Sequence, residues 1–253
     1  MKLKALAIIL SFFSLNALSQ SNLSANEVFE KVIQHYDPDG KWAQFRGTIH
    51  INTYGEDWSG EENLTIDNAN NFYRSIRKAD GKVLAKGMDD GQVFFEVGGK
   101  KLTASSVPAA YQKVPYYLTE QNVRMSAENH IGHFSVPLMM HAAGAKPNTT
   151  VGMKEFFGVN CLTLTFEDGL PNNYENGLFN GAITLYVDAE NDYRLQAIYL
   201  DNDFFGKGVG GYALLMGEME VDGLKIPARK IYLHGKTLQP FVIDVFDMEL
   251  IEE

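Results

Sequence analysis

One helical segment interrupts a chain that is otherwise a succession of short strands and turns, and it limits the folds available. It extends from Tyr111 to Ala145, where helix-forming residues replace the alternation of apolar and polar side chains. Alternation with a period of two is typical of a strand buried on one face, so its loss predicts a helix here. An apolar helix between two runs of strands is either the core plug of a β-protein or a lid over a cavity. The residues leave both possibilities open.

Within this segment we predict a short helix that begins at Ser135 and stops at Gly144. The serine can cap the helix, and Pro137 suits its first turn because the missing N–H of proline costs nothing there. Glycine is the residue most often found just after a helix end. The helix would present flexible apolar side chains that adapt to irregular partners, namely Leu138, Met139 and Met140.

Strand patterns flank this segment on both sides. Before it, Phe45, Ile49 and Ile51 alternate with polar residues, and Asp90-Gly91 is a strong tight-turn signal. After it, Asp222-Gly223 joins two further strands. The two runs supply about eleven strands, and a sheet that large must curl, split or close. We therefore expect a mainly β (α+β) fold: a large curved antiparallel sheet or half-open β-barrel with an N-terminal helix and a helical lid insert.

The N-terminal helix has the clearest local signal. Ser24 and Glu27 form a capping box, in which each side chain meets the backbone N–H of the other residue. Apolar residues then recur at helical spacing up to Tyr36, and Asp37-Pro-Asp-Gly40 ends the helix.

Residues 1–19 have the features of a secretory signal peptide. Lys2 and Lys4 form a basic start, and the 11-residue apolar run from Ala5 to Leu15 is too short to cross a bilayer. Small residues precede Gln20, so we predict cleavage before it. Residues 20–253 are then expected to form a single exported domain without a transmembrane segment.

Charge and cysteine content exclude several classes of protein. Removal of Lys2 and Lys4 takes the formal net charge from −10 to −12, which argues against binding to nucleic acid or to anionic membrane surfaces. The one cysteine, Cys161, cannot form an internal disulfide, and its place in an apolar alternation predicts a buried, inert thiol.

Motifs that could support chemistry are weak. Residues 206–211 fit G-x-G-x-x-G, but a strand pattern follows where a nucleotide site needs a helix. His130, His133 and His141 fall within the helical segment without the spacing of a zinc protease. We therefore predict no catalytic residues, no metal site and no cofactor.

Three segments resemble a known family: His35-Tyr-Asp-Pro-Asp-Gly-Lys-Trp42, Phe134-Ser-Val-Pro-Leu138 and Tyr186-Val-Asp188. They are similar to segments of uncharacterised exported DUF6503-type proteins of Bacteroidetes-type bacteria. The order of elements resembles the LolA/LolB-type fold, a half-open β-barrel with a helical lid used by periplasmic lipoprotein carriers. This resemblance covers nearly the whole mature chain and implies a fold, a periplasmic or secreted location, and a hydrophobic ligand.

We expect the concave sheet face and the lid to enclose a lipid, an acyl chain or a lipoprotein anchor in a non-catalytic, monomeric binding or carrier protein. Candidate lining residues, each equally suited to a packed core, are Trp42, Phe45, Ile49, Phe72 and Phe95 on the sheet and Phe134, Leu138, Met139 and Met140 on the lid.

Two other functions stay open at this point. The first is a cell-envelope protein-protein interaction module, which an intact core without a cavity would favour. The second is a periplasmic hydrolase, which a convergent cluster of His130, His133 and an acidic side chain would favour.

Overall fold

The structure is a computed structural model that describes residues 23–79, 82–102, 119–169, 179, 181–201 and 209–251. The predicted signal peptide, its cleavage site and the first part of the helical segment lie outside these residues. The same holds for residues 206–208, the first half of the glycine-rich motif at residues 206–211.

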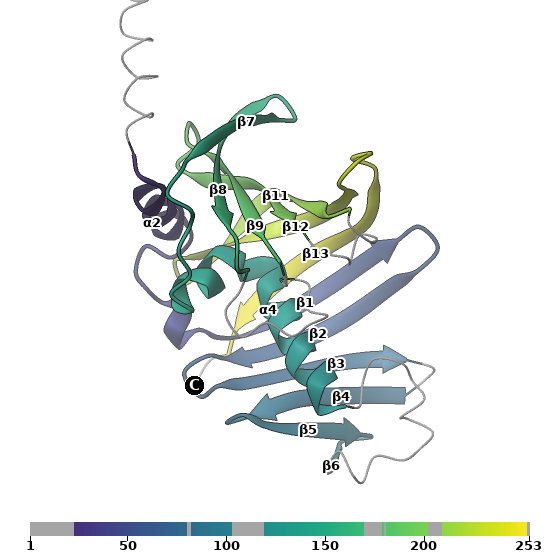
Figure 1. Cartoon of the computed structure of the whole chain (residues 1–253). Helices are drawn as coiled ribbons and strands as arrows, with labels where there is room; N and C mark the ends of the chain where they lie inside the picture. The colour runs from purple at the N-terminus through teal and green to yellow at the C-terminus, as the bar shows by residue number, and fades with distance from the viewer. Residues whose placement is uncertain are drawn as a thin grey trace, which may run out of the picture.

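The described residues form one antiparallel sheet of thirteen strands, in the order β6-β5-β4-β3-β2-β1-β13-β12-β11-β10-β9-β8-β7 (Figure 1). The first half comprises β1 (Arg46–Gly55), β2 (Ser59–Asp67), β3 (Phe72–Ala79), β4 (Lys82–Asp89), β5 (Gln92–Val97) and β6 (Lys100–Leu102). The second comprises β7 (Gly152–Phe156), β8 (Val159–Phe166), β9 (Ile183–Asp188), β10 (Arg194–Leu200), β11 (Gly211–Val221), β12 (Leu224–His234) and β13 (Pro240–Leu250).

The two halves join where β1 pairs with β13, the first strand with the last. Strands β6 and β7 consequently stand at opposite edges of the described sheet, although only residues 103–151 separate them in sequence. The described helix in this stretch accordingly crosses the sheet. Helix α4 (Glu120–Ala142) contacts β3, β4, β5 and β12 (Figure 1), so the predicted open sheet with a covering helix is confirmed.

Tight turns connect the hairpins as their sequences predict. Asp90 and Gly91 have φ of 46° and 74°, and Asp222 and Gly223 have φ of 50° and 81°, the left-handed pair of a type I′ turn. The Phe157-Gly158 turn adopts the same conformation and joins β7 to β8. The sequence did not predict β7, because phenylalanine is not a residue that favours this turn conformation.

Helix α2 (Ala25–Tyr36) confirms the predicted capping box. The Glu27 carboxylate accepts from the Ser24 N–H at 2.7 Å, and the Ser24 hydroxyl accepts from the Glu27 N–H at 3.3 Å. Its apolar residues are buried against β10, β12 and α4. A 3-10 turn, η1 (Trp42–Gln44), leads into β1, and the Asp37 carboxylate accepts from two backbone N–H groups there.

Helix α4 differs from its prediction. It begins at Glu120, directly after its N-cap Thr119, whose hydroxyl accepts from the Asn122 N–H. The helix runs to Ala142 with a break at Ser135, where φ is −130° and ψ is 26°. The Ser135 hydroxyl donates to the Ile131 carbonyl at 2.6 Å. A helical segment with Pro137 in its first turn does follow the break at Ser135, as predicted, but residues 120–134 form a longer helical segment before the break that the sequence did not predict. Gly144, with φ of 70°, ends the helix as predicted.

The main core lies between the helices and the inner, helix-covered face of the sheet. A smaller cluster on the outer face includes Phe156, Tyr186, Tyr212 and Cys161. Burial, and to a smaller extent Asp188, raises the pKa of the Cys161 thiol to about 11. The prediction of a buried cysteine is therefore confirmed.

Candidate ligand-binding cavity on the inner face

Most of the predicted lining residues lie in the packed core. Six of them share one buried cluster: Trp42, Phe45, Ile49, Phe134, Leu138 and Met140. Met139 packs against that cluster and is partly exposed. The space beside Phe134 and Leu138 is only about 10 Å³, which is room for a single water molecule.

The other two predicted residues lie elsewhere. Phe95 packs with Val123 in a small separate cluster beneath the first half of α4. Phe72 stacks on Phe94 with a ring separation of 6.3 Å. The next residue, Tyr73, reaches α4 on the inner face, and successive residues of a strand alternate between faces. Phe72 therefore points to the outer face.

A cavity of about 170 Å³ opens on the inner face beside α4. Its lining side chains come from β1, β2, β12, β13, the β1–β2 turn and α4. The strand register explains how they meet, because Thr53 lies opposite Asp244, and Ile51 lies opposite Glu62. The lining residues are Ile51, Thr53, Trp58, Glu62, His130, Tyr232, Val242 and Asp244.

Trp58 is the exposed member of this lining, with 52% of its surface accessible. It is the last residue of the β1–β2 turn and packs over Gly55, whose N–H donates to the Trp58 carbonyl at 2.8 Å. A Cβ at Gly55 would lie 2.2 Å from the indole nitrogen, so only glycine permits this position. The half-exposed indole therefore lies between the cavity and the solvent.

One polar group on the cavity wall is centred on Glu62. Its carboxylate accepts from the Ser75 hydroxyl and lies 3.3 Å from Nε2 of His130. Nδ1 of His130 lies 2.5 Å from the Tyr73 hydroxyl. Burial alone would raise the pKa of Glu62. The pKa is nevertheless lowered from its ordinary value by the nearby His130, the hydrogen bond from Ser75, and the cations Lys86 and Arg77. Glu62 is therefore an ionised carboxylate at neutral pH.

A second polar group is centred on Asp244, which accepts from the Thr53 hydroxyl at 2.7 Å. Lys230 lies opposite Asp244 in the register of β12 and β13, with its Nζ 5.5 Å from the ring centre of Tyr232. Burial lowers the pKa of Lys230 to about 7, although Asp244 partly opposes this. Buried charges are costly unless they are paired. A charged pair in an otherwise apolar interior therefore marks this part of the cavity wall as a candidate for function.

The same residues test the hydrolase alternative. A serine nucleophile must donate to its histidine base, yet Ser75 donates to Glu62. In the neutral imidazole both His130 nitrogens have partners, since Nε2 faces Glu62 and Nδ1 faces Tyr73. The side chain of His133 lies outside the described residues, and His141 is exposed at 3.9 Å from Glu30. Ser75, which donates to Glu62, therefore does not form the serine–histidine arrangement of a hydrolase. Among the described residues, no His, Cys, Asp or Glu side chains gather in a group of three suited to a metal ion.

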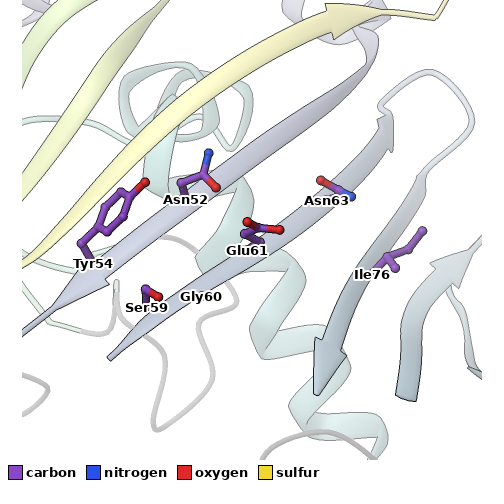
Figure 2. Close-up of a pocket in the computed structure, with 7 residues that line it drawn as sticks. All are labelled: Asn52, Tyr54, Ser59, Gly60, Glu61, Asn63 and Ile76. Atoms are coloured by element: carbon purple, nitrogen blue, oxygen red, sulfur yellow. The ribbon is translucent and has the colours of Figure 1, made fainter. Parts of the chain in front are cut away.

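A larger hollow of about 310 Å³ lies on the outer face of β1, β2 and β3. Figure 2 shows Asn52, Tyr54 and Glu61 projecting from neighbouring strands on that side. The remaining lining residues are Ser59, Gly60, Asn63 and Ile76. A polar outer face is what an antiparallel sheet with one solvated side presents, so this hollow has an ordinary structural explanation.

Sequence reasoning missed the polar residues of the inner cavity, although a signal was present. Asp244 interrupts the inward series of Val242, Phe246 and Met248 on β13, and Lys230 interrupts a similar series on β12. A charged residue at an inward position of an alternating strand must find a partner across the sheet. That criterion identifies both residues.

No family model matches the sequence, and no curated protein matches it significantly. Within the described part of the chain, no helix has both the length and the apolar character that crossing a membrane would require. Solved structures do show similarity. A DUF1329 family protein from Desulfovibrio piger has 8% identity, a TM-score of 0.41 and coverage of 89% of this chain and 92% of its own. The lipoprotein LppX from Mycobacterium tuberculosis has 8% identity, a TM-score of 0.26 and coverage of 87% and 93%.

A LolA superfamily protein from Nitrosomonas europaea has 12% identity and a TM-score of 0.51, over 91% of this chain and 95% of its own. At this identity the likeness concerns the fold alone. The chain has a LolA-like fold.

Proposed function

We propose that this chain is an exported, non-catalytic binding or carrier protein that holds a hydrophobic ligand between the inner sheet face and α4. The ligand would be a lipid, an acyl chain or a lipoprotein anchor. The observation that most supports this is the inner cavity, which opens beside Trp58 in a sheet of LolA-like fold. The proposal includes a periplasmic or secreted monomer, a signal peptide cleaved before Gln20, and kinship with the DUF6503-type proteins of Bacteroidetes-type bacteria.

The size of the cavity indicates how a ligand would enter. At about 170 Å³ it is smaller than most small-molecule pockets, which range from about 300 to 1,000 Å³. A whole acyl chain therefore requires α4 to move. The break at Ser135 divides α4 into two segments that can change their relative angle.

The two segments of α4 are held differently. The second segment places Leu138 and Met140 in the main core. The first segment reaches that core through Ala127 and Phe134, whereas its N-terminal end packs through Val123 in the small cluster around Phe95. The first segment is also held by polar contacts, such as that of the Lys86 ammonium with Ser126 at 2.7 Å. We propose that the first segment acts as the lid. Its opening would give an acyl chain access to the predicted lining residues.

Lipid mass spectrometry on the mature protein, purified from its native envelope and denatured, tests this proposal. We expect one class of lipid in stoichiometric amount. Trp58→Ala should reduce retention because the side chain lies at the cavity, and its 52% exposure makes a folding defect small. Tyr54→Ala is the matched control, since Tyr54 is 50% exposed on the same hairpin but lines the outer hollow.

Two results would contradict the carrier proposal. The first is an empty extract from a protein that also fails to take up added lipid, which would favour the envelope interaction module. The second is equal loss of lipid in Trp58→Ala and Tyr54→Ala, because a ligand on the inner face should distinguish the two positions.

A further inference from the structure

We infer that the outer hollow on β1, β2 and β3 is a second binding site, and that its ligand is a neutral carbohydrate. Binding there would be additional to the proposed function, because the hollow lies on the face of the sheet opposite the inner cavity. Its volume of about 310 Å³ reaches the lower end of the range of small-molecule pockets, about 300 to 1,000 Å³. A solvated face explains polar side chains, but it does not explain a hollow of this size that includes a half-exposed aromatic ring.

The strand register places the lining side chains in pairs across the sheet. Asn52 lies opposite Glu61, and Tyr54 lies opposite Ser59, where β1 pairs with β2. Directly opposite residues of an antiparallel pair share a face, with Cβ atoms about 4.5–5.5 Å apart. Ile76 adds an apolar side chain from β3 (Figure 2). The lining is therefore held mainly by paired strands, which position a site more exactly than loops do.

The polar groups of this lining are open to a ligand. Within the described part of the chain, the side chains of Asn52, Tyr54 and Glu61 have no hydrogen bond or ion pair. Asn63 differs, because its Oδ1 lies 2.6 Å from Nδ1 of His50. An amide oxygen can only accept, so His50 donates in this contact, and the two N–H donors of Asn63 stay available with their orientation fixed.

This combination of groups fits a ligand rich in hydroxyl groups. Each hydroxyl of a sugar both donates and accepts, and the amide of Asn52 offers both roles while Asn63 offers donors. The Glu61 carboxylate can accept from two hydroxyls, and hydrogen bonds to a charged group are stronger than those between neutral groups. The Tyr54 ring, 50% exposed, presents an apolar face to the C–H side of a sugar ring and a hydroxyl at its tip.

The same lining disfavours other classes of ligand. An anion would meet Glu61 without a lysine or arginine among the described lining residues. Two arginines of β1 and β3 are already paired, Arg46 with Asp67 at 3.5 Å and Arg74 with Glu96 at 2.6 Å. An acyl chain would cover the amides without bonding to them, which is costly. A cation would use the carboxylate and leave the amide donors unused. A neutral ligand with many hydroxyls is the class that uses all of these groups.

Saturation-transfer NMR on the mature protein at pH 7 tests the inference with a panel of short neutral oligosaccharides made of glucose, galactose, mannose or N-acetylglucosamine. Short oligosaccharides of glucosamine and of galacturonic acid are the cationic and anionic comparison probes. We expect at least one neutral probe to bind, and to bind more tightly than both charged probes. Titration followed by protein amide shifts gives the affinities.

Matched variants connect binding to the hollow. Glu61→Gln keeps the shape of the side chain and should weaken the neutral probe roughly fivefold, because charge-assisted hydrogen bonds become neutral ones. Glu56→Gln removes the same charge from the exposed β1–β2 turn outside the lining and should leave the affinity unchanged. Tyr54→Ala should cost roughly tenfold, as loss of an aromatic anchor commonly does, with circular dichroism to verify the fold.

Three results would overturn the inference. They are failure of every neutral probe to bind, tighter binding of a charged probe, and an affinity unchanged in both Glu61→Gln and Tyr54→Ala. A sugar affinity that falls in Trp58→Ala but not in Tyr54→Ala would place the sugar in the inner cavity and would also overturn it. The carrier proposal is tested separately, because lipid retention should depend on Trp58 and not on Tyr54.

Discussion

Lys230 makes a specific prediction about how the stability of this protein depends on pH. Its side chain is 1% exposed, and burial lowers its pKa from 10.5 to about 7, with Asp244 partly opposing the change. An unfolded lysine keeps its proton in this pH range, so the unfolded state binds more protons than the folded state above pH 7. Stability must then rise with pH.

The magnitude follows from the two pKa values. Each pKa unit is worth about 1.4 kcal/mol, so the charged lysine costs the folded state up to about 5 kcal/mol at low pH. Between pH 7 and 9 the contribution of Lys230 to the free energy of unfolding should increase by about 2 kcal/mol. Lys86, whose pKa burial lowers to about 8, should add about 1 kcal/mol in the same direction.

Urea denaturation followed by circular dichroism at pH 7, 8 and 9 measures this slope. The double variant Lys230→Met, Asp244→Asn removes both partners, so that no uncompensated charge stays buried. We expect it to lose about two thirds of the wild-type rise, while Lys236→Met, at an exposed lysine, keeps all of it. Parallel slopes for the wild type and the double variant would refute the assignment of the slope to Lys230.

Three further predictions concern stability. Ser24→Ala removes the α2 cap and should lower the free energy of unfolding by about 1 kcal/mol in urea, an effect that an unchanged midpoint would contradict. Gly132→Ala places a Cβ 2.1 Å from the Phe179 ring, and the resulting overpacking should cost about 1–3 kcal/mol; a thermal midpoint equal to wild type would show that the ring can move away. Burial raises the pKa of Glu128 to about 7, and its Oε2 is buried without a hydrogen-bond partner. Between pH 4.5 and 7 the folded state therefore holds a proton that the unfolded state has lost, so the free energy of unfolding should fall as pH rises through this range. Denaturation curves recorded across the range should show this fall for the wild type and not for Glu128→Gln.

Local sequence patterns were sufficient for the elements whose cause is local. The capping box at Ser24 and Glu27 and the turn at Asp90-Gly91 depend on residues within a few positions of each other, and the structure reproduces them. The alternation at Ile49 and Ile51 likewise predicts which strand face is buried. These signals were enough for the class of fold, since so many amphipathic strands require a curved sheet with a covered face.

The sequence was less informative where a distant contact decides the outcome. The Phe157-Gly158 turn lacks the usual residues, so β7 was missed although it completes an edge of the sheet. The sequence predicted the helical segment that follows Ser135 but not the longer segment, residues 120–134, that precedes it, because a serine two residues before a proline suits a helix start as well as a break within a longer helix.

The candidate cavity was decided by tertiary structure alone. Its polar centres join residues far apart in the chain, such as Thr53 with Asp244. Each residue by itself looks like an ordinary polar position in a strand, and only the register between the first and last strands brings the two side chains together. Register is set by burial of the whole inner face, because a slip of one residue would turn every side chain of a strand to the opposite side. The sequence by itself therefore determined the kind of sheet, and the pairing of β1 with β13 determined where its buried charges meet.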